Sequence, residues 1–280
     1  MAGTLYVVAT PIGNLEDLTF RAKRVLGEAD VIACEDTRHA RVLLAHYGIG
    51  TRMVSYHEQN ERERAPELVQ RLRRGEDVAL ISDAGTPSVS DPGFPLIREA
   101  IAAGIAVVAV PGPSAALAAL AVSGLPTDRF VFLGFLPRRS GERIRALEAV
   151  RALPWTLVIY EAPHRVTAAL HDLLVVLGDR RVVVARELTK RFEEVFRGTA
   201  SEARAHLAVH PPRGELTLVV EGASDGAPAV PQAPGDARST MRELIRAGRS
   251  PKNAVAEVMR TSGLARREAY RLLLEVQGKR

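Results

Sequence analysis

The sequence contains a single cysteine, Cys34, so no intramolecular disulfide can form and no cysteine-rich metal site is available. No apolar run approaches the roughly 20 residues that a transmembrane helix needs. The first residues carry no basic stretch of the kind that precedes the apolar core of a signal peptide, so we expect no such peptide. Together these absences favour a protein of the reducing cytosol.

Two glycine-rich motifs that bind phosphate groups, GxGxxG and GxxxxGK followed by Ser or Thr, are also absent. Residues 77–93, DVALISDAGTPSVSDPG, instead join an apolar strand pattern to a loop of Asp, Gly, Thr, Pro and Ser. Because residues 78–97 include no Lys or Arg and carry Asp83 and Asp91, this loop favours a neutral or cationic ligand over a phosphate. Loops at the carboxyl ends of strands usually bind the ligands of open α/β sheets. A tight strand-to-helix connection without a ligand is the alternative.

Strand and helix patterns alternate along most of the chain, which favours the α/β class, with a parallel sheet in the first half. The expected strands are 5–9, 31–34, 53–56, 78–82, 105–110, 130–133, 156–160, 181–185 and 216–220. Helical patterns occupy the intervals between them and recur at 240–247, 252–260 and 266–276. We therefore expect an N-terminal α/β domain at 1–114, a second α/β domain at 115–224, a linker at 225–236 and an all-helical module at 237–280.

The net charge of +5 is unevenly distributed along the chain. Residues 236–280 contain eleven Lys or Arg and five Asp or Glu, whereas the rest of the chain contains 27 basic and 28 acidic residues. The basic excess therefore lies in the C-terminal module, which points to nucleic acid or another polyanion as a partner. A solvated helical face rich in arginine is the alternative.

A series of longer motifs carries a resemblance to a known family. In chain order the motifs are ATPIGNLEDLTFRA at 9–22, CEDTRHARVLL at 34–44, SYHEQNERER at 55–64, ISDAGTPSVSDPG at 81–93, PGPSA at 111–115, LPTDRFVFLGFLPR at 125–138, YEAPHR at 160–165, ARELTKRFEE at 185–194 and RGE at 213–215. The series resembles the bacterial small-subunit ribosomal RNA cytidine 2′-O-methyltransferases of the tetrapyrrole-methylase-like superfamily. One position departs from the family pattern, since Gln59 stands where a second histidine is expected.

The resemblance implies two α/β domains with a cleft between them, S-adenosylmethionine as cofactor, a homodimer and no metal. It implies methylation of the 2′ oxygen of a cytidine in the decoding region of 16S ribosomal RNA, in the small ribosomal subunit, by a cytoplasmic protein without membrane contact. A methyltransferase for a small tetrapyrrole and a non-enzymatic RNA-binding factor for ribosome assembly are the alternatives. The basic C-terminal module favours RNA over a porphyrinoid.

A positively charged sulfonium cofactor favours carbonyls and carboxylates on the floor of such a cleft. On the resemblance, the cofactor-binding residues are Pro11, Ile12, Gly13, Asp83, Ala84, Gly85, Thr86, Val89, Ser114, Ala115, Ala162, Leu188 and Thr217. For each of these positions, turn geometry or core packing is the alternative explanation.

An RNA substrate favours lysine and arginine on the rim of the cleft. The expected RNA-binding residues are Arg38, His57, Arg138, Arg139, Arg143, His164, Arg165, Lys190 and Arg191. Arginines that serve only solubility are the alternative.

Methyl transfer to a ribose hydroxyl is an in-line displacement, in which alignment of the partners contributes most and a base adds about 10²–10⁴-fold. The candidate catalytic residues are Glu187, Lys190 and Asp36. A lysine acts as a base only where burial or neighbouring positive charge lowers its pKa. Glu187 and Lys190 are three residues apart and could equally form a structural ion pair, and His57 could serve a helix cap.

Overall fold

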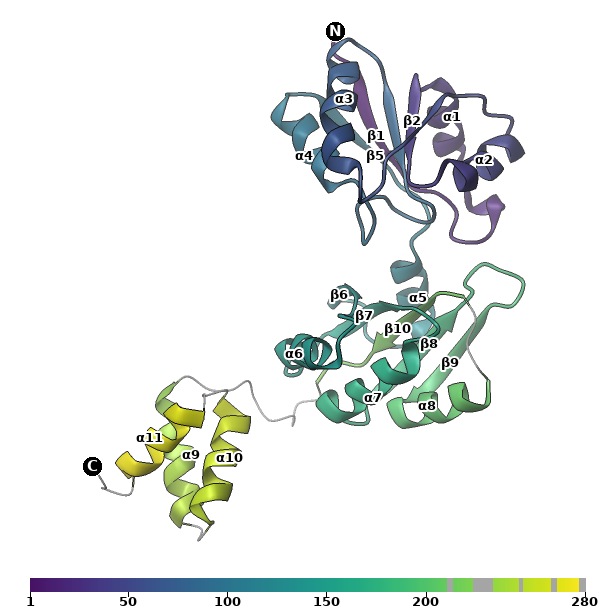
Figure 1. Cartoon of the computed structure of the whole chain (residues 1–280). Coiled ribbons are helices and arrows are strands. Elements are labelled where there is room, and N and C mark those ends of the chain that lie inside the picture. Colours follow the sequence, from purple (N-terminus) through teal and green to yellow (C-terminus); the bar gives the residue numbers. More distant parts are fainter. Residues whose placement is uncertain (211–213, 224–233, 247–248, 263–265, 277–280) are drawn as a thin grey trace. The chain divides into compact units, whose positions relative to one another are not determined.

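The computed structural model describes residues 1–210, 214–223, 234–246, 249–262 and 266–276. They form two compact units, the first made of Met1–Val150 with Pro154–Gly222 and the second of Arg151–Leu153 with Ala223–Arg280. Among the described residues, strands occur only in the first unit, and the second unit contains helices (Figure 1). No helix in these ranges is both long and apolar enough to cross a membrane.

The N-terminal half of the first unit is built on a parallel five-stranded sheet in the order β3-β2-β4-β1-β5. Its strands are β1 Thr4–Val8, β2 Val31–Cys34, β3 Met53–Ser55, β4 Val78–Ile81 and β5 Ala106–Val110. The connecting helices are η1 Leu15–Asp17, α1 Phe20–Glu28, α2 Thr37–His46, α3 Glu61–Arg73 and α4 Phe94–Ala102. The parallel sheet predicted for this half is confirmed.

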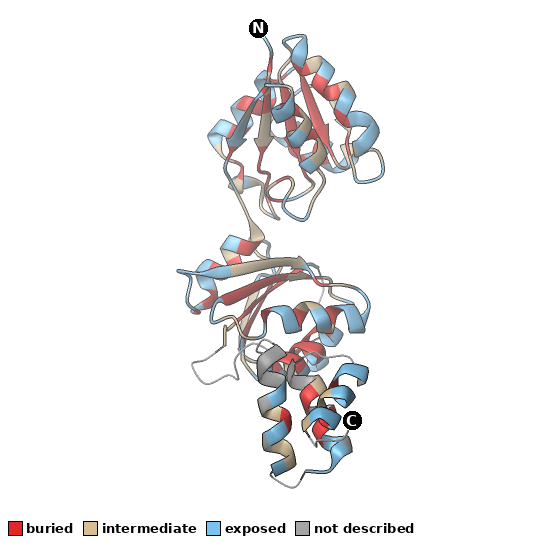
Figure 2. Ribbon diagram, turned by 90° about the vertical axis from the view of Figure 1, so that its left-hand side faces the viewer, coloured by how far each residue is buried: buried red, intermediate tan, exposed pale blue. Residues whose placement is uncertain are grey.

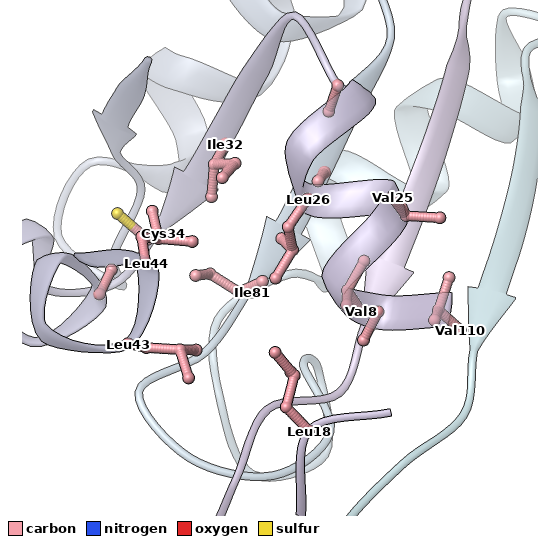
Figure 3. Packing of buried hydrophobic residues seen from close by; sticks show 14 residues of the cluster. Val8, Leu18, Val25, Leu26, Ile32, Cys34, Leu43, Leu44, Ile81 and Val110 are labelled. Carbon is pink, nitrogen blue, oxygen red and sulfur yellow. The ribbon is translucent and has the colours of Figure 1, made fainter. Parts of the chain in front are cut away.

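Helices cover both faces of this sheet, because its central strands bury side chains on both sides. Strand β4 shows the alternation: Val78 and Leu80 pack into one core, and Ala79 and Ile81 into the other. Helices α1 and α2 close the core that contains Ile81, as the close-up in Figure 3 shows. Helices α3 and α4 close the core that contains Leu80, and the strands between the two layers are mostly buried (Figure 2). The carboxyl ends of all five strands therefore meet at one edge.

The C-terminal half of the first unit contains a mixed sheet in the order β6-β7-β10-β8-β9. Its strands are β6 Phe130–Phe135, β7 Thr156–Glu161, β8 Arg181–Arg186, β9 Glu194–Thr199 and β10 Leu216–Val220. Only β6 and β7 pair in parallel, and the other pairs are antiparallel. The accompanying helices are α5 Ala115–Ser123, α6 Ser140–Val150, α7 Val166–Leu177 and α8 Ala200–Val209. Two α/β halves agree with the expected fold class.

Strand β9 was not predicted from the sequence. Its six residues, EVFRGT, carry charges at Glu194 and Arg197, and none of them is buried. The strand forms because it pairs along its whole length with β8, from Arg181 opposite Thr199 to Arg186 opposite Glu194. An edge strand with one partner needs little apolar patterning, so its sequence gives a weak signal.

The second unit contains α9 Pro234–Arg246, α10 Pro251–Ser262 and α11 Arg266–Val276. They pack around a core of Met241, Ala254, Val255, Val258, Ala269 and Leu273. The predicted linker at 225–236 lies outside the described residues as far as residue 233, and its last three residues belong to α9. Helix α9 thus begins six residues before the predicted start, because the sparse apolar pattern of its first turns gave no signal.

Candidate active site

A cavity of about 240 Å³ lies where loops from both halves of the first unit meet. The N-terminal half contributes residues that follow its strands, namely Ile12, Glu35, Asp83, Ala84, Gly85, Thr86, Val89, Ser90, Asp91 and Ser114, and Ala115 at the start of α5 adds to them. The C-terminal half contributes Phe135, Tyr160, Ala185, Glu187, Leu188, Lys190, Glu215, Leu216 and Thr217. The cavity is therefore built from segments far apart in the sequence, at the position where open α/β sheets bind ligands.

Backbone hydrogen bonds tie the loop after β4 to the loop after β1. The amides and carbonyls of Thr10 and Gly85 bond to each other in both directions, at 2.8 and 3.0 Å. Gly85 has a φ of +79°, a conformation that costs a residue with a Cβ more than it costs glycine. The Thr86 hydroxyl donates to the carbonyl of Pro113 at 3.3 Å, so a third loop is held in the same assembly.

Two cavity loops share an unusual backbone pattern, in which residues with positive φ flank one apolar residue. In the loop after β4, Ser88 and Ser90 have φ values of 66° and 65° on either side of Val89. In the loop after β8, Glu187 and Thr189 have φ values of 51° and 67° on either side of Leu188. The pattern turns both apolar side chains into the cavity lining. Left-handed residues other than glycine cost about 1–3 kcal/mol each and concentrate at functional sites.

Lys190 and Glu187 form an ion pair at the cavity, with Nζ 2.9 Å from Oε1 and side chains 40% and 21% exposed. Two glycines make room for this pair. A Cβ on Gly13 would lie 2.5 Å from Cγ of Lys190, and one on Gly214 would lie 1.8 Å from Oε1 of Glu187. Gly13 therefore supports the site through Lys190, although it does not line the cavity itself.

The cavity is strongly acidic, since its described lining includes five carboxylates and a single lysine, Lys190. Burial raises the pKa of Asp91 to about 6, and the charges of Glu35, Glu215 and Asp83 add to this increase. Burial and the Asp83 charge likewise raise the pKa of Glu35. Asp83 is itself fixed by the backbone N–H of Asp36, which donates to Oδ1 at 3.0 Å.

The carboxylates and apolar side chains of the cavity fit an organic cation with apolar parts. The carboxylates supply negative charge, while Ile12, Val89 and Leu188 supply apolar surface. Tyr160 accepts a hydrogen bond from the backbone N–H of Ala116 at 3.1 Å, so its ring fixes the start of α5 at the cavity wall. No group of three or more His, Cys, Asp or Glu side chains in the described ranges is arranged to hold a metal ion.

Comparison with known proteins places the chain in a family. The sequence profile of the Tetrapyrrole (Corrin/Porphyrin) Methylases matches residues 4–204. The chain belongs to the tetrapyrrole methylases. The family resemblance drawn from the sequence motifs is thereby confirmed.

Among curated tetrapyrrole methylases the chain has relatives that match over nearly their whole length. It is 47% identical to the Ribosomal RNA small subunit methyltransferase I of Pseudomonas aeruginosa, with 99% of each chain covered. It is 46% identical to the protein of that name from Halalkalibacterium halodurans, with 96% of this chain and 94% of the relative covered. A solved structure of uroporphyrin-III C-methyl transferase from Thermus thermophilus, complexed with S-adenyl homocysteine, shares the fold with a TM-score of 0.55. The two sequences are 24% identical, and the match covers 78% of this chain and 97% of the Thermus protein.

Most of the expected cofactor-binding residues of this tetrapyrrole methylase line the cavity, and three do not. Those in the lining are Ile12, Asp83, Ala84, Gly85, Thr86, Val89, Ser114, Ala115, Leu188 and Thr217. Pro11, Gly13 and Ala162 lie outside it, and Ala162 follows Glu161, whose carboxylate accepts from its backbone N–H at 2.9 Å.

Sequence reasoning named Asp91 only as a charge that favours a cationic ligand, and it left several other lining residues off the expected site, namely Glu35, Ser90, Phe135, Tyr160, Ala185, Glu215 and Leu216. Phe135 and Tyr160 lie at the carboxyl ends of β6 and β7, and that position was the available signal. Glu215 precedes β10, which runs antiparallel to its neighbours, so no rule about carboxyl ends points to it.

Of the three candidate catalytic residues, Glu187 and Lys190 line the cavity and Asp36 does not. The Asp36 carboxylate caps α2 through the backbone N–H of Arg38 at 2.8 Å and pairs with the Arg38 guanidinium at 2.7 Å. These hydrogen bonds hold the pKa of Asp36 well below its usual range, which makes it a weak base. Arg38 is engaged in the same pair and is exposed.

Arg143 is not a rim residue, contrary to expectation. Its guanidinium lies 2.6 Å from Oδ2 of Asp172, and the two side chains are only 5% and 7% exposed. It also donates to the carbonyls of Pro137 and Arg138, at 3.3 and 3.2 Å. Arg143 therefore joins α6 to α7 through a buried charge pair.

Arg165 is also largely committed within the fold. Its Nε lies 3.3 Å from the fully buried carboxylate of Glu161, and its guanidinium donates to the carbonyl of Leu136. The other expected rim residues Arg138, Arg139, His164 and Arg191 are exposed. His57 is half-buried at the start of α3, where its backbone N–H donates to Asn60 Oδ1 at 2.8 Å. Gln59 is exposed and outside the cavity lining.

Proposed function

We propose that this tetrapyrrole methylase transfers a methyl group from S-adenosylmethionine to the 2′ oxygen of a cytidine in the 16S RNA of the small ribosomal subunit, at its decoding region. One observation carries the proposal: a chain that matches ribosomal RNA small subunit methyltransferases I at 46–47% identity has an acidic cavity at its strand ends. Negative charge there favours a cationic methyl donor, and the exposed arginines farther out favour a polyanion.

The residues present fit S-adenosylmethionine. When bound, the cofactor would supply an electrophilic methyl group on a positively charged sulfur. The five cavity carboxylates favour that charge, and the backbone of the loop at 83–86 offers hydrogen-bonding groups close to it. We assign cofactor binding to the lining residues expected from the sequence, with Pro11, Gly13 and Ala162 as supports of the adjacent backbone.

The chain's own contribution to catalysis is alignment and exclusion of water. The loops after β4 and β8 line the cavity with the apolar residues Val89 and Leu188, and a fixed geometry of this kind lowers the barrier to an in-line displacement. Lys190 pairs with Glu187 at 2.9 Å, so we assign it an electrostatic role through its positive charge. The pair positions the substrate at the cavity entrance.

The RNA side of the proposal rests on exposed basic residues. Arg138, Arg139, His164 and Arg191 are solvent-accessible in the first unit. In the second unit, described arginines at 238, 242, 246, 249, 267 and 271 are exposed, in a segment with an excess of six positive charges. Contacts of this type bind phosphates without reading sequence, which suits a large structured RNA.

The proposal includes a cytoplasmic homodimer. Helix α5 is almost entirely apolar, yet Leu117 and Val122 on it are 56% and 44% exposed, and Val108 on the edge strand β5 is 38% exposed. A second copy of this chain is the partner that the family resemblance implies for such a surface. Sedimentation of wild type and of a Leu117→Glu variant tests this part, with loss of the dimer expected in the variant.

The activity is tested with methyl-labelled S-adenosylmethionine and small ribosomal subunits that lack the modification. After nuclease digestion, mass spectrometry should find the label on the 2′ oxygen of one cytidine. Label on a base, or no label, contradicts the proposal. A parallel reaction with uroporphyrinogen should give no product, and methylation there would favour a tetrapyrrole substrate instead.

A further inference from the structure

A second, wider cavity of about 710 Å³ adjoins the first along one side. Three residues, Glu35, Ser90 and Asp91, line both cavities and so form a shared lip. Beyond this lip the second cavity is walled by the starts of α3 and α4 and by the loop that precedes α4. A molecule in the second cavity would therefore contact residues that also line the first.

The second cavity exposes an aromatic ring next to a cation. Phe94 is 65% exposed at the first position of α4, and Cζ of Arg98 lies 5.8 Å from its ring centroid. Arg62 on α3 also lines this cavity and is exposed. Within the part of the chain that the structure describes, neither arginine forms an ion pair, so both are available to a ligand.

Exposed aromatic rings flanked by arginines are the usual binding surface for single-stranded nucleic acid, because bases stack on the ring and phosphates pair with the cations. The cavity also contains carboxylates, Glu58, Glu61 and Glu99 among them. Carboxylates repel phosphates, but they accept hydrogen bonds from the exocyclic amino group of cytosine and from ribose hydroxyls. The mixture therefore suits a whole nucleotide better than a phosphate alone.

We infer that the second cavity receives the nucleotide to be methylated, with its base against Phe94, its phosphates near Arg62 and Arg98, and its 2′ hydroxyl at Asp91 on the shared lip. This inference rests on the proposed function and names the substrate subsite and the base for that reaction. It assigns proton removal to Asp91 and leaves Glu187 and Lys190 with a positioning role.

Methyl transfer at the shared lip forms one bond to carbon and breaks another. The 2′ oxygen forms a bond to the methyl carbon, and the electron pair of the broken carbon–sulfur bond leaves with the sulfur of the donor. The hydroxyl proton passes to a carboxylate oxygen of Asp91. The groups that face Asp91 are Glu35, Asp83, Glu215, Tyr160 and the hydroxyl of Ser82. Burial of Asp91 and the negative charges of Glu35, Glu215 and Asp83 raise its pKa to about 6, against the hydrogen bond from Ser82, which lowers it. Asp91 is therefore a stronger base than an ordinary carboxylate.

The base-stacking part is tested with Phe94→Ala and with Ile101→Ala as matched control, since Ile101 is 62% exposed on the same helix and lines neither cavity. Fluorescence anisotropy measures the binding of fluorescein-labelled hexacytidylate without cofactor. Phe94→Ala should weaken binding about tenfold and raise the KM for small subunits similarly, because stacking carries that much affinity. Ile101→Ala should leave both unchanged. Equal behaviour of the two variants would overturn the assignment.

The phosphate part is tested with Arg62→Gln and Arg98→Gln against Arg73→Gln, an exposed position on α3 outside both cavities. Each cavity variant should lower the slope of log Kd against log salt by about 0.7, the value for one phosphate contact on a single strand. Arg73→Gln should not change it. An unchanged slope in all three variants would contradict the placement of the phosphates.

The base is tested with Asp91→Asn at saturating S-adenosylmethionine and saturating small subunits. The expected loss in kcat is about 10²–10⁴-fold, with hexacytidylate binding retained. Wild-type kcat should fall about tenfold per pH unit below pH 6 and stay level above it, and the variant should lose this dependence. A kcat near the wild-type value overturns the role of Asp91.

These results separate the two proposals. If wild type methylates no small subunit, the proposed function fails, whatever the variants bind. If wild type is active and calorimetry shows equal cofactor affinity in wild type and Phe94→Ala, while hexacytidylate affinity is also equal, the subsite fails alone.

Discussion

Two ion pairs in the C-terminal half of the first unit differ in their burial. Arg143 and Asp172 are 5% and 7% exposed and join α6 to α7. Lys190 and Glu187 are 40% and 21% exposed and border the cavity. A buried pair is committed to the fold, because breaking it leaves a charge without solvent or partner. A pair at a cavity keeps part of its hydrogen-bonding capacity for a ligand.

Removal of the buried partner should have the largest effect on stability. Arg143→Ala leaves the Asp172 carboxylate buried without its cation, so the free energy of unfolding should fall by about 3–5 kcal/mol. Urea unfolding followed by circular dichroism measures it. Arg139→Ala is the control, since Arg139 is 87% exposed and pairs with Glu142 at 3.6 Å on the surface. A similar loss in both variants would show that burial does not distinguish the two arginines.

Replacement of the cavity carboxylate Asp91 should stabilise the protein, whereas replacement of Arg143 should destabilise it. The pKa of Asp91 is raised to about 6 in the folded protein, so ionisation of this carboxylate opposes folding. The loss in the free energy of unfolding disappears below about pH 4, where Asp91 is protonated in both the folded and the unfolded protein. Asp91→Asn should therefore stabilise the cofactor-free protein at pH 8 by about 1–2 kcal/mol, after allowance for solvent screening, and not at pH 4.

Asp179 is the control for the sign of that effect. It accepts hydrogen bonds from the backbone N–H and the hydroxyl of Ser201, at 2.8 and 2.7 Å, which lower its pKa. Asp179→Asn should therefore destabilise at pH 8, where the carboxylate is charged. The same sign in both variants, measured by thermal unfolding at the two pH values, would contradict the electrostatic account.

Lys190→Gln should separate function from folding. Because the pair with Glu187 is partly exposed, the free energy of unfolding should change by less than about 1 kcal/mol. The value of kcat/KM on small subunits should fall about tenfold, as expected for the loss of one charged contact to the substrate. A large loss of stability with unchanged kcat/KM would assign this pair to the fold, like that of Arg143.

The smallest effect concerns the strained loop after β4. Ser90 has a φ of 65°, so Ser90→Gly should stabilise the protein by up to about 1 kcal/mol through relief of strain, offset in part by the greater entropy of the unfolded chain. Ser90→Ala retains the strain and should give no gain. Chemical denaturation of both variants checks this, and equal stability would show that the backbone there is unstrained.

Much of the fold followed from local patterns in the sequence. The apolar run of β4 predicted a strand buried on both faces, and its side chains do enter two different cores. The edge strand β9 escaped prediction because it depends on its pairing with β8 and carries little apolar signal of its own.

The site was predictable where it depends on loops after strands, and not where it depends on tertiary burial. Asp83 and Gly85 lie in the cavity lining because such loops meet at one sheet edge. The burial of Arg143 against α7, and the approach of Glu215 to Asp91 from an antiparallel strand, depend on how distant elements pack. No spacing rule along one strand contains that information.

The most direct test of the central claim, that an acidic cavity holds a cationic cofactor, is calorimetric titration between pH 5 and pH 8. Affinity for S-adenosylmethionine should rise about tenfold as the Asp91 carboxylate, with its pKa of about 6, becomes charged. S-adenosylhomocysteine, which lacks the positive sulfur, should show a clearly weaker dependence on pH. Identical pH dependence for the two ligands, or no binding of either, would contradict the account.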